Sequence, residues 1–273
     1  MLTLNDRALL DLANLRLKLF EIRPQELGEL TRRQLGGGLA SKVLVYSRPG
    51  QEAEWARRGL RREGVIRGFF RDRTEAQVWA VYTELSRACE HGRLEHEENL
   101  RLALGRPLLE SAGLPEGYRT SRATPAMAGE ISALLQATFR VYPSPLQPGH
   151  IAEQIERGAN LFRVVHAPDQ SLAAVASAEL DREHRSAEMT DCATAIDHRG
   201  RGLMARLLFR LELDVFEHCG ISDFYTLARA CEVSMNCVFA KLGYGYTGRL
   251  VNNCRMPTGW ESMNVWCKRM RAC

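Results

Sequence analysis

The stretch Asp197-His198-Arg199-Gly200-Arg201-Gly202-Leu203-Met204 decides the fold that this sequence predicts. It follows a strand-like run at 187–196 and precedes residues 203–219, where apolar side chains recur at helical spacing. The two glycines allow a tight turn that approaches a ligand closely. The first turn of the helix offers unpaired N–H groups and the positive end of its dipole. With two arginines beside it, this turn is predicted to bind a pyrophosphate.

Two other phosphate-binding motifs do not fit this stretch. A P-loop needs Gly-Lys followed by Ser or Thr, and no lysine follows these glycines. A dinucleotide-binding fold needs an acidic residue at a set distance after a glycine loop that follows its first strand. Here the loop comes after several antiparallel-looking strands, and no Asp stands at that distance.

The chain has 273 residues, enough for two ordinary domains of about 100–200 residues each. We predict an N-terminal block at 1–117, ending in the turn-rich segment 113–117, and a C-terminal block at 118–273. In the first block we expect strands at 42–47, 65–70 and 77–82, a helix at 51–63 and a helical tail at 82–105. In the second we expect helices at 125–139, 148–157, 203–219 and 235–242, and strands at 160–166, 171–180, 187–196, 224–228, 246–251 and 263–267.

The two blocks resemble each other near their ends. The run from Trp55 to Leu60, followed by Gly64, parallels the run from Phe239 to Tyr244, followed by Gly248, with the same offsets. Val78-Trp79 parallels Val265-Trp266 nearly as well. An ancient duplication of a strand-helix-strand-strand unit explains these matches, and chance is the alternative.

Composition excludes several classes of protein. The 37 Lys and Arg against 33 Asp and Glu leave a net charge of +4, too small for nucleic acid or anionic lipid to be the main partner. No apolar run approaches the ~20 residues of a membrane span, and Asp6, Arg7 and Asp11 interrupt the place of a secretory signal. The 8 cysteines form no C-x-x-C pair and no zinc-spaced cluster. We expect a reduced, metal-free, cytoplasmic protein with no nucleic-acid or membrane partner.

Several motifs resemble a known family. Arg199-Gly200-Arg201-Gly202 after a central strand, together with the segment Asn236 to Tyr244, resembles the acetyl-CoA-binding core of the GNAT N-acetyltransferase superfamily over roughly residues 120–270. Further segments resemble the β-lysine ε-N-acetyltransferases, which also carry an N-terminal block of this kind. They are Arg140 to Pro145, Ala174 to Glu179, Glu188 to Asp191, Ala228 to Ala230, Leu250 to Asn253 and Glu261 to Trp266.

The resemblance implies an α/β (α+β) fold, with a GNAT-type mixed central sheet flanked by helices. The sheet would splay between the strands at 187–196 and 224–228, with acetyl-CoA in the gap, and the smaller first block would be a degenerate half of the same fold. The family usually has Gly or Ala where Met204 stands, and methionine narrows the room beside the diphosphate. No metal is implied. The implied acetyl-CoA ligands are Cys192, Thr194, Arg199, Gly200, Arg201, Gly202, Leu203, Met204 and Asn236.

An amine attacks a thioester only as the free base, and a lysine-type amine has a reference pKa of ~10.4. Members of the superfamily often carry a carboxylate on the strand before the loop that removes the proton. Glu188, which we prefer, and Asp191 are the candidates here; each also fits a sheet-edge charge or a salt-bridge partner. Three positions apart, they face opposite sides of a regular strand, unless a bulge intervenes.

Relatives often protonate the leaving thiolate with a tyrosine where this chain has Phe239. Tyr225 or Tyr244 would have to replace it, or the thiolate leaves unprotonated. A backbone N–H near Thr194 would meet the negative charge on the carbonyl oxygen.

For the acceptor, the resemblance points to a carboxylate ligand at Arg229, a cover at Tyr142 and polar contacts at Asn252 and Asn253. The other interpretation of Arg229 is a cap or a structural ion pair. The other interpretation of the two asparagines is a turn.

We therefore expect an acetyl-CoA-dependent N-acetyltransferase that converts β-lysine to the compatible solute Nε-acetyl-β-lysine. A functional link to lysine 2,3-aminomutase, which makes β-lysine from lysine, follows from the resemblance. The alternatives are another acceptor (lysine, a polyamine or a protein lysine) or a module that binds acetyl-CoA without turnover. The sequence is compatible with a homodimer but does not fix the oligomeric state.

Overall fold

One β-sheet of 13 strands runs through the computed structural model of the protein, which describes residues 2–5, 7–35, 39–111, 113–139, 145–256 and 259–271. The strand order is β1-β2-β3-β4-β6-β5-β12-β13-β11-β10-β9-β8-β7. The pairs β3–β4 and β10–β11 are parallel, and the other neighbours are antiparallel. The sheet is therefore mixed, which confirms the predicted fold class.

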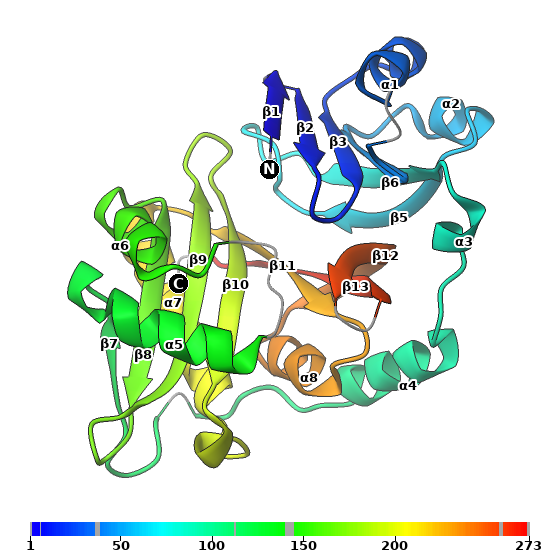
Figure 1. Cartoon of the computed structure of the whole chain (residues 1–273). Coiled ribbons are helices and arrows are strands. Elements are labelled where there is room, and N and C mark those ends of the chain that lie inside the picture. Colours follow the sequence, from blue (N-terminus) through cyan, green and yellow to red (C-terminus); the bar gives the residue numbers. More distant parts are fainter. Residues whose placement is uncertain are drawn as a thin grey trace.

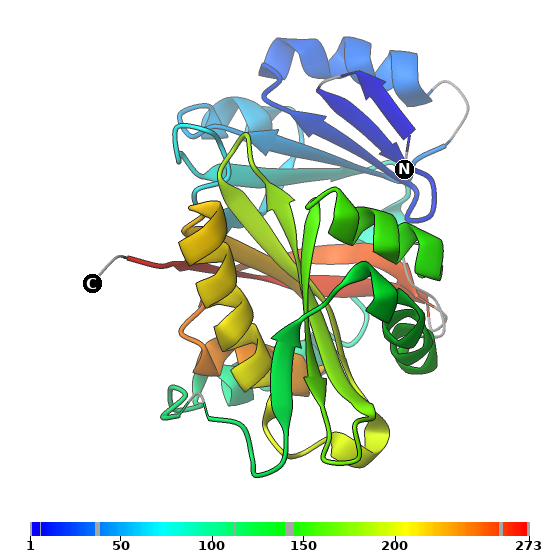
Figure 2. The same ribbon diagram turned by 90° about the vertical axis from the view of Figure 1, so that its left-hand side faces the viewer.

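The C-terminal half forms the larger part of the fold (Figure 1). Its elements are β7 (Arg119–Arg122), η2 (Pro125–Met127), α5 (Ala128–Thr138), α6 (Pro148–Glu156), β8 (Asn160–His166), β9 (Leu172–Asp181), β10 (Ser186–Thr194), η3 (Ile196–His198), α7 (Leu203–Cys219), β11 (Asp223–Arg229), α8 (Val233–Lys241), β12 (Gly245–Met256) and β13 (Gly259–Arg269). Figure 2 shows α7 on one face of the sheet and α5 and α6 on the other. Alternate residues of β9 explain this layering, because Ala174 and Ala176 pack with α7 whereas Val175 packs with α5.

The N-terminal half holds the other six strands. Its elements are β1 (Leu2–Asn5), β2 (Ala8–Asp11), β3 (Arg16–Phe20), η1 (Pro24–Glu26), α1 (Leu27–Leu35), β4 (Lys42–Ser47), α2 (Glu52–Arg57), β5 (Arg61–Ile66) and β6 (Ala76–Tyr82). The linking helices α3 (Leu85–Ala88) and α4 (Arg93–Leu104) then carry the chain back to the C-terminal half (Figure 1). Leu17 and Leu19 of β3 pack with Val43, Val45 and Trp55 in a core of this half.

Most predicted elements are present, and the differences have local causes. The helix predicted at 51–63 ends at Arg57, because the chain reverses through Gly59 at φ +79° and Arg61 already begins β5. Of the strand predicted at 65–70, only residues 65–66 belong to β5; residues 67–70 lie outside any strand, because the chain turns at Gly68 with φ +66°. Residues 2–35 form β1–β3, η1 and α1, none of which we predicted from the sequence.

The two halves meet where β5 lies antiparallel to β12, with Gly64 opposite Gly248. A Cβ on Gly248 would lie 2.3 Å from both the carbonyl oxygen of Glu63 and the Cα of Gly64, so the backbones approach too closely for a side chain. Beside this contact, the buried Lys42 ammonium binds the Glu63 carboxylate at 2.7 Å and the carbonyl oxygen of Val251 at 2.6 Å. The halves therefore form one continuous sheet with a buried ion pair at the seam.

The two halves also share their registers. In the first, Arg62 pairs with Trp79 and Gly64 with Val78, with an irregularity between them. In the second, Tyr246 pairs with Trp266 and Gly248 with Val265, again with an irregularity between them. The segments that resemble each other in sequence thus occupy equivalent places in the sheet.

We predict that Gly248→Ala lowers the free energy of unfolding by about 1–3 kcal/mol, because the new methyl group overpacks against backbone that moves only if the halves separate. Gly259→Ala is the matched control, since Gly259 also has a positive φ (+121°) but open space around its Cα. Urea unfolding of both variants measures the difference. Equal losses of stability would contradict the close-approach argument.

Candidate active site

The central strands β10 and β11 separate part of the way along. Their parallel pairing covers only Ser186–Glu188 against Asp223–Tyr225. The Thr226 hydroxyl then donates to the carbonyl oxygen of Met189 at 2.8 Å. Beyond that bond the strands run on to Thr194 and Arg229 with no further pairing between them in the described residues. The predicted splay is confirmed, and its open edges offer backbone groups that a ligand can pair with.

The turn at the open end of this wedge presents amides without side-chain caps. Gly200 and Gly202 have φ of +77° and +69°, and no side chain caps the start of α7. Arg199 donates to the carbonyl oxygen of Thr194 at 3.1 Å, which holds its cation near the turn. Arg201, also exposed, lies between the two glycines. Unpaired amides, a helix dipole and two cations fit a diphosphate.

The side chains of Leu203 and Met204 point away from this turn. Both side chains are buried in the core with Leu207 and Leu208. The Met204 side chain therefore packs against the sheet, and it does not narrow the space beside the glycine turn as we predicted. Cys192 is half-buried on β10, and burial raises the pKa of its thiol. A thiol that keeps its proton is a poor nucleophile, so the geometry gives no support to an acetyl-cysteine route.

Asn236, predicted to contact the coenzyme, is fully committed inside the protein. Its Nδ2 donates to the carbonyl oxygens of Arg229 and Glu232, each at 2.9 Å. Its Oδ1 accepts from Asn264 at 2.8 Å and from the Trp266 indole at 2.9 Å. These bonds satisfy the amide completely and fasten α8 to β11 and β13. We therefore leave Asn236 out of the coenzyme site proposed below.

The two predicted carboxylates share one face of the sheet. Glu188 lies opposite Glu179 in the β9–β10 ladder. A bulge between Thr190 and Ala193, with Asp191 at φ +50°, interrupts the alternation of β10. The Asp191 carboxylate accepts a hydrogen bond from Ser177, which lies two residues from Glu179 on the same face of β9. The bulge thus brings Asp191 to the side of Glu188.

Glu188 lies where the wedge closes, and its environment suits a base at neutral pH. Burial raises the pKa of its carboxyl to about 7, and the neighbouring Glu179 carboxylate adds to this, while Lys18 and a hydrogen bond from Tyr225 oppose it. Burial and Glu188 together raise the pKa of Tyr225 well above its usual range, so this hydroxyl keeps its proton. A half-ionised carboxyl beside a protonated phenol is an arrangement for acid–base chemistry.

The N-terminal half supplies a wall opposite these carboxylates that the sequence analysis did not predict. The Tyr46 and Phe69 rings stack at 5.5 Å, and Phe69 meets the Tyr225 ring edge-on at 6.2 Å. Lys18 projects from β3 toward the same place, close enough for its charge to act on Glu188. The signal in the sequence was the alternation Arg16-Leu17-Lys18-Leu19-Phe20, typical of a strand with one polar face.

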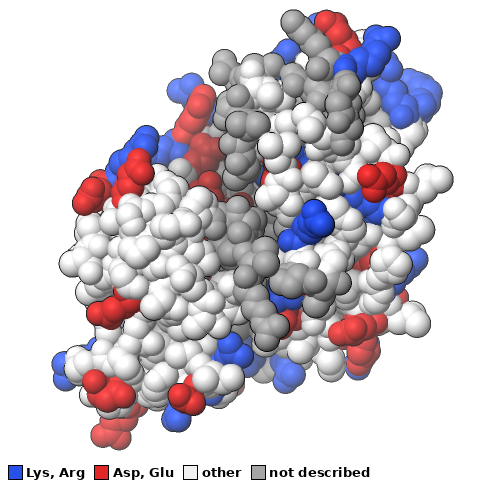
Figure 3. All heavy atoms as spheres, viewed as in Figure 1, with Lys and Arg blue, Asp and Glu red and all other residues white. Residues whose placement is uncertain are grey.

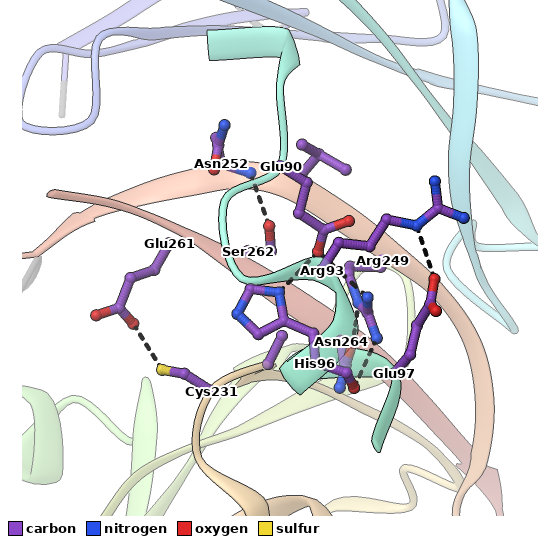
Figure 4. Close-up of polar contacts among 12 residues, drawn as sticks. Glu90, Arg93, His96, Glu97, Cys231, Arg249, Asn252, Glu261, Ser262 and Asn264 are labelled. Carbon is purple, nitrogen blue, oxygen red and sulfur yellow. Dashed lines mark hydrogen bonds and ion pairs between the residues drawn. The ribbon is translucent and has the colours of Figure 1, made fainter. Parts of the chain in front are cut away.

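Arg229 forms the structural ion pair that was one of its two interpretations. Its Nε and Nη2 bind the Glu261 carboxylate at 2.6 and 2.8 Å, and its Nη1 binds Glu232 at 3.2 Å. Glu261 also accepts from the Cys231 thiol at 3.4 Å (Figure 4). A substrate carboxylate would have to displace this bidentate partner, so Arg229 takes no part in the proposal below.

Asn252 and Asn253 are buried where β12 meets the N-terminal half and its linker. The Asn252 amide donates to the carbonyl oxygens of Arg87 at 2.8 Å and Cys89 at 2.7 Å, and its backbone N–H donates to Ser262 (Figure 4). Asn253 has no exposed surface. Among the described residues, no hydrogen bond joins either asparagine to Glu188. Tyr142 lies outside the described residues.

Surface charge, helix length and the grouping of possible metal ligands relate to the partners and cofactors considered in the sequence analysis. On the face shown in Figure 3, the described acidic and basic side chains are interspersed, so charges of opposite sign lie close together there. No helix among the described residues is long and apolar enough to cross a membrane. In that same part of the chain, no three His, Cys, Asp or Glu side chains gather as a metal site would require.

We predict that Gly202→Val weakens acetyl-CoA binding at least tenfold, because a branched side chain at φ +69° distorts the turn whose amides face the ligand. Gly220→Val is the matched control: Gly220 has φ +65° and ends the same helix, α7, with open space around it. Titration calorimetry with acetyl-CoA compares the two. Wild-type affinity in Gly202→Val would place the coenzyme elsewhere.

Comparison with known proteins agrees with this geometry. The sequence pattern of the Acetyltransferase (GNAT) family matches residues 130–244. The chain is 30% identical over 270 residues to the β-lysine N(6)-acetyltransferase of Methanosarcina mazei, covering 91% of this chain and 98% of the relative. It is 31% identical over 232 residues to N-acetyltransferase YodP of Bacillus subtilis, covering 85% and 83%.

Among solved structures, the dodecameric spermidine N-acetyltransferase of Vibrio cholerae matches with a TM-score of 0.50 at 17% identity, over 57% of this chain and 95% of that one, which shows a likeness of fold. The family match covers the strands that separate and the glycine turn. Because the similarity to the Methanosarcina enzyme extends almost from end to end, we conclude that this chain belongs to the GNAT family of acetyl-CoA-dependent N-acetyltransferases.

Proposed function

We propose that the protein transfers the acetyl group of acetyl-CoA to the ε-amine of β-lysine. The observation that carries this proposal is the placement of Glu188, whose carboxyl has a pKa of about 7 and lies where the wedge between β10 and β11 closes. The full-length similarity to a β-lysine N(6)-acetyltransferase supports the choice of acceptor.

Acetyl-CoA supplies an activated acyl carbon. Glu188 and Tyr225, at the closed end of the gap between β10 and β11, would accept and donate the protons. The acceptor arrives as an ammonium ion, and Glu188 takes its proton because the two charges lie side by side in a poorly hydrated place. The neutral amine nitrogen then attacks the acyl carbon, and as the C–S bond breaks the nitrogen loses its surplus proton, which balances the proton that the sulfur takes up. We propose Tyr225, whose raised pKa keeps it protonated, as the group that passes a proton to the departing sulfur and then regains one from the amide nitrogen.

Asp191 is the second candidate base. Its carboxylate lies on the same face as Glu188 and is oriented by Ser177 at the bulge of β10. In this arrangement Asp191 lies nearer the open wedge and Glu188 nearer the N-terminal half. The pH dependence of variants at each position distinguishes them.

The coenzyme part of the proposal rests on the backbone. The amides from Gly200 to Met204 would hold the diphosphate, with Arg199 and Arg201 near it. The open edge of β10 from Cys192 to Thr194 would pair with the pantetheine arm, and an amide near Thr194 would face the carbonyl oxygen of the acetyl group.

If β-lysine is the acceptor, an enzyme that moves the amino group of lysine from the α- to the β-carbon must supply it. That is the reaction of lysine 2,3-aminomutase. The product has lost the charge of its ε-amine and is net neutral, which suits the proposed role as an osmolyte in the cytoplasm.

A thiol-release assay with acetyl-CoA tests the choice of acceptor. We expect the highest kcat/KM with β-lysine, lower values with lysine, and the lowest with spermidine or a lysine-containing peptide. A higher kcat/KM with spermidine or the peptide would overturn the proposed acceptor while leaving the class of reaction intact.

We predict that Glu188→Gln lowers turnover at pH 7 by about a hundredfold, the lower end of the contribution of a general base. The loss should be much smaller at pH 9.5, where more acceptor is already deprotonated. In the wild type, kcat/KM should rise through pH 7, because the pKa of Glu188 is about 7 and the carboxylate is the active form.

Glu183→Gln, an exposed change in the β9–β10 turn, is the control and should leave the pH profile unchanged. Asp191→Asn tests the second candidate. If that variant loses the rise through pH 7 while Glu188→Gln keeps it, Asp191 is the base instead.

A further inference from the structure

The N-terminal half repeats the topology of the C-terminal half. Read inward toward the seam, its strand order β1-β2-β3-β4-β6-β5 matches β8-β9-β10-β11-β13-β12 of the C-terminal half, where β7 is an additional strand at the outer edge. The third and fourth strands are the parallel pair in both, with a helix between them. We take the block at 1–117 as a degenerate copy of the unit at 118–273.

The shared registers fix which residues correspond. Val78 and Val265 are equivalent, because they pair with Gly64 and Gly248. Val78 lies opposite Tyr46, whereas Val265 lies opposite Leu227. Leu44, two residues before Tyr46, pairs with Lys18. Tyr225, two residues before Leu227, pairs with Glu188. Lys18 therefore occupies in the first half the place that Glu188 occupies in the second.

The parallel strands of the first half stay paired beyond the point where β10 and β11 separate. Pairing of β3 with β4 continues past Lys18 to Phe20 opposite Tyr46. The chain then enters α1 through Pro24-Gln25-Glu26, with neither a glycine pair nor a basic residue in that triplet. Because β3 and β4 stay hydrogen-bonded to each other, their backbone groups are not available to a ligand, and only the side chains on their exposed face can bind one.

That face is turned toward the active site. Lys18 lies on the side of β3 opposite Leu17 and Leu19, which are in the core. The β9–β10 turn reaches up beside the N-terminal half in both ribbon views, and its His184 stacks on Phe69 at 6.2 Å (Figures 1 and 2). Lys18 and Glu188 thus face each other from equivalent strands of the two halves.

The charge of Lys18 lies close to those of Glu179 and Glu188 but forms no ion pair with either in the described residues. Lys18 acts electrostatically on both Glu179 and Glu188. In the described ranges, however, Lys18 has no ion pair within 4.0 Å and no side-chain hydrogen bond, and the same is true of Glu179. Arg16, on the same face, differs, because the Asp11 carboxylate already binds its guanidinium. A separated cation and anion with free hydrogen-bonding capacity suit a dipolar ligand between them.

We propose that Lys18 binds the carboxylate of the acceptor and that Glu179 binds its second ammonium, so that the degenerate N-terminal half selects amino acids over simple diamines. The inference rests on the proposed function, because it concerns the acceptor of the same reaction. In β-lysine the carboxylate and the β-ammonium are separated by one methylene group, so a facing lysine and glutamate match both charges. The ε-amine at the other end of the chain then extends toward the wedge.

The environment of Lys18 supports this role. Burial lowers the pKa of its ammonium, and Arg16 lowers it further, while Glu188 opposes the shift. A partly buried ammonium without a contacting partner is costly to the free protein. An incoming carboxylate removes that cost, so part of the binding energy is specific to ligands that carry one.

The test compares β-lysine with 1,4-diaminopentane, the diamine that remains when the carboxylate of β-lysine is replaced by hydrogen; it is called diaminopentane below. Lys18→Met should lower kcat/KM for β-lysine roughly tenfold to a hundredfold, the effect of losing one charge-assisted hydrogen bond, mainly through KM. The kcat/KM for diaminopentane should stay within about twofold, and Lys18→Arg should recover part of the loss for β-lysine. Glu179→Gln should lower kcat/KM for both acceptors, since both carry the second ammonium group.

Arg57→Met, on the exposed surface of α2, removes the same charge far from the site and is the matched control. Calorimetry with acetyl-CoA and thermal unfolding verify that Lys18→Met still binds coenzyme and folds. Equal losses for the two acceptors, or none for either, would overturn the role of Lys18. A wild-type protein that does not prefer β-lysine to this diamine would also overturn the proposed selection of amino acids, whereas the proposed acceptor fails separately, through a higher kcat/KM with spermidine or a lysine-containing peptide.

Discussion

The close approach of β5 and β12 at Gly64 and Gly248 is the constraint on which the rest of the molecule depends. With no Cβ on Gly248, the two backbones pair and the strands of both halves become one sheet. The buried Lys42–Glu63 pair and its bond to Val251 fix the seam further. Because the seam sets where the halves lie, it also sets where β3 stands relative to β10. The position of Lys18 and Tyr46 relative to Glu188, on which the proposed acceptor site rests, therefore depends on a contact between glycines.

The two halves show how one topology yields two kinds of surface. Where parallel strands stay hydrogen-bonded, as β3 and β4 do, their backbone groups are satisfied and only side chains remain for recognition. Where pairing stops after Glu188 and Tyr225, the freed backbone edges can hold an extended ligand. The glycine turn and uncapped helix follow only the strand that separates. In the proposed function, the coenzyme therefore binds the C-terminal half, and the N-terminal half contributes side chains to the acceptor site.

Glu188 and Lys18, which lie between the two halves, are ionised at a cost to the stability of the folded protein, because burial disfavours the charged form of each. Glu188 binds its proton more tightly in the folded protein than its usual pKa of 4.5 allows, with a folded value of about 7. Its contribution to stability is therefore present below the usual pKa and is lost as pH rises through about 7. Lys18, with its pKa lowered by burial, is likewise not in its most favourable environment. Groups held in this way are common at sites whose ligands relieve the strain.

The sequence by itself determined the local parts of this protein. The glycine turn and the helix at 203–219 follow from residues adjacent in the chain, since backbone freedom, capping and helical spacing act over a few positions. Only the tertiary structure decided the use of Asn236, Arg229 and Asn252, because their partners lie on other strands and helices. The same holds for Lys18, whose place opposite Glu188 depends on strand pairing between residues more than a hundred positions apart, and no local pattern encodes such pairing.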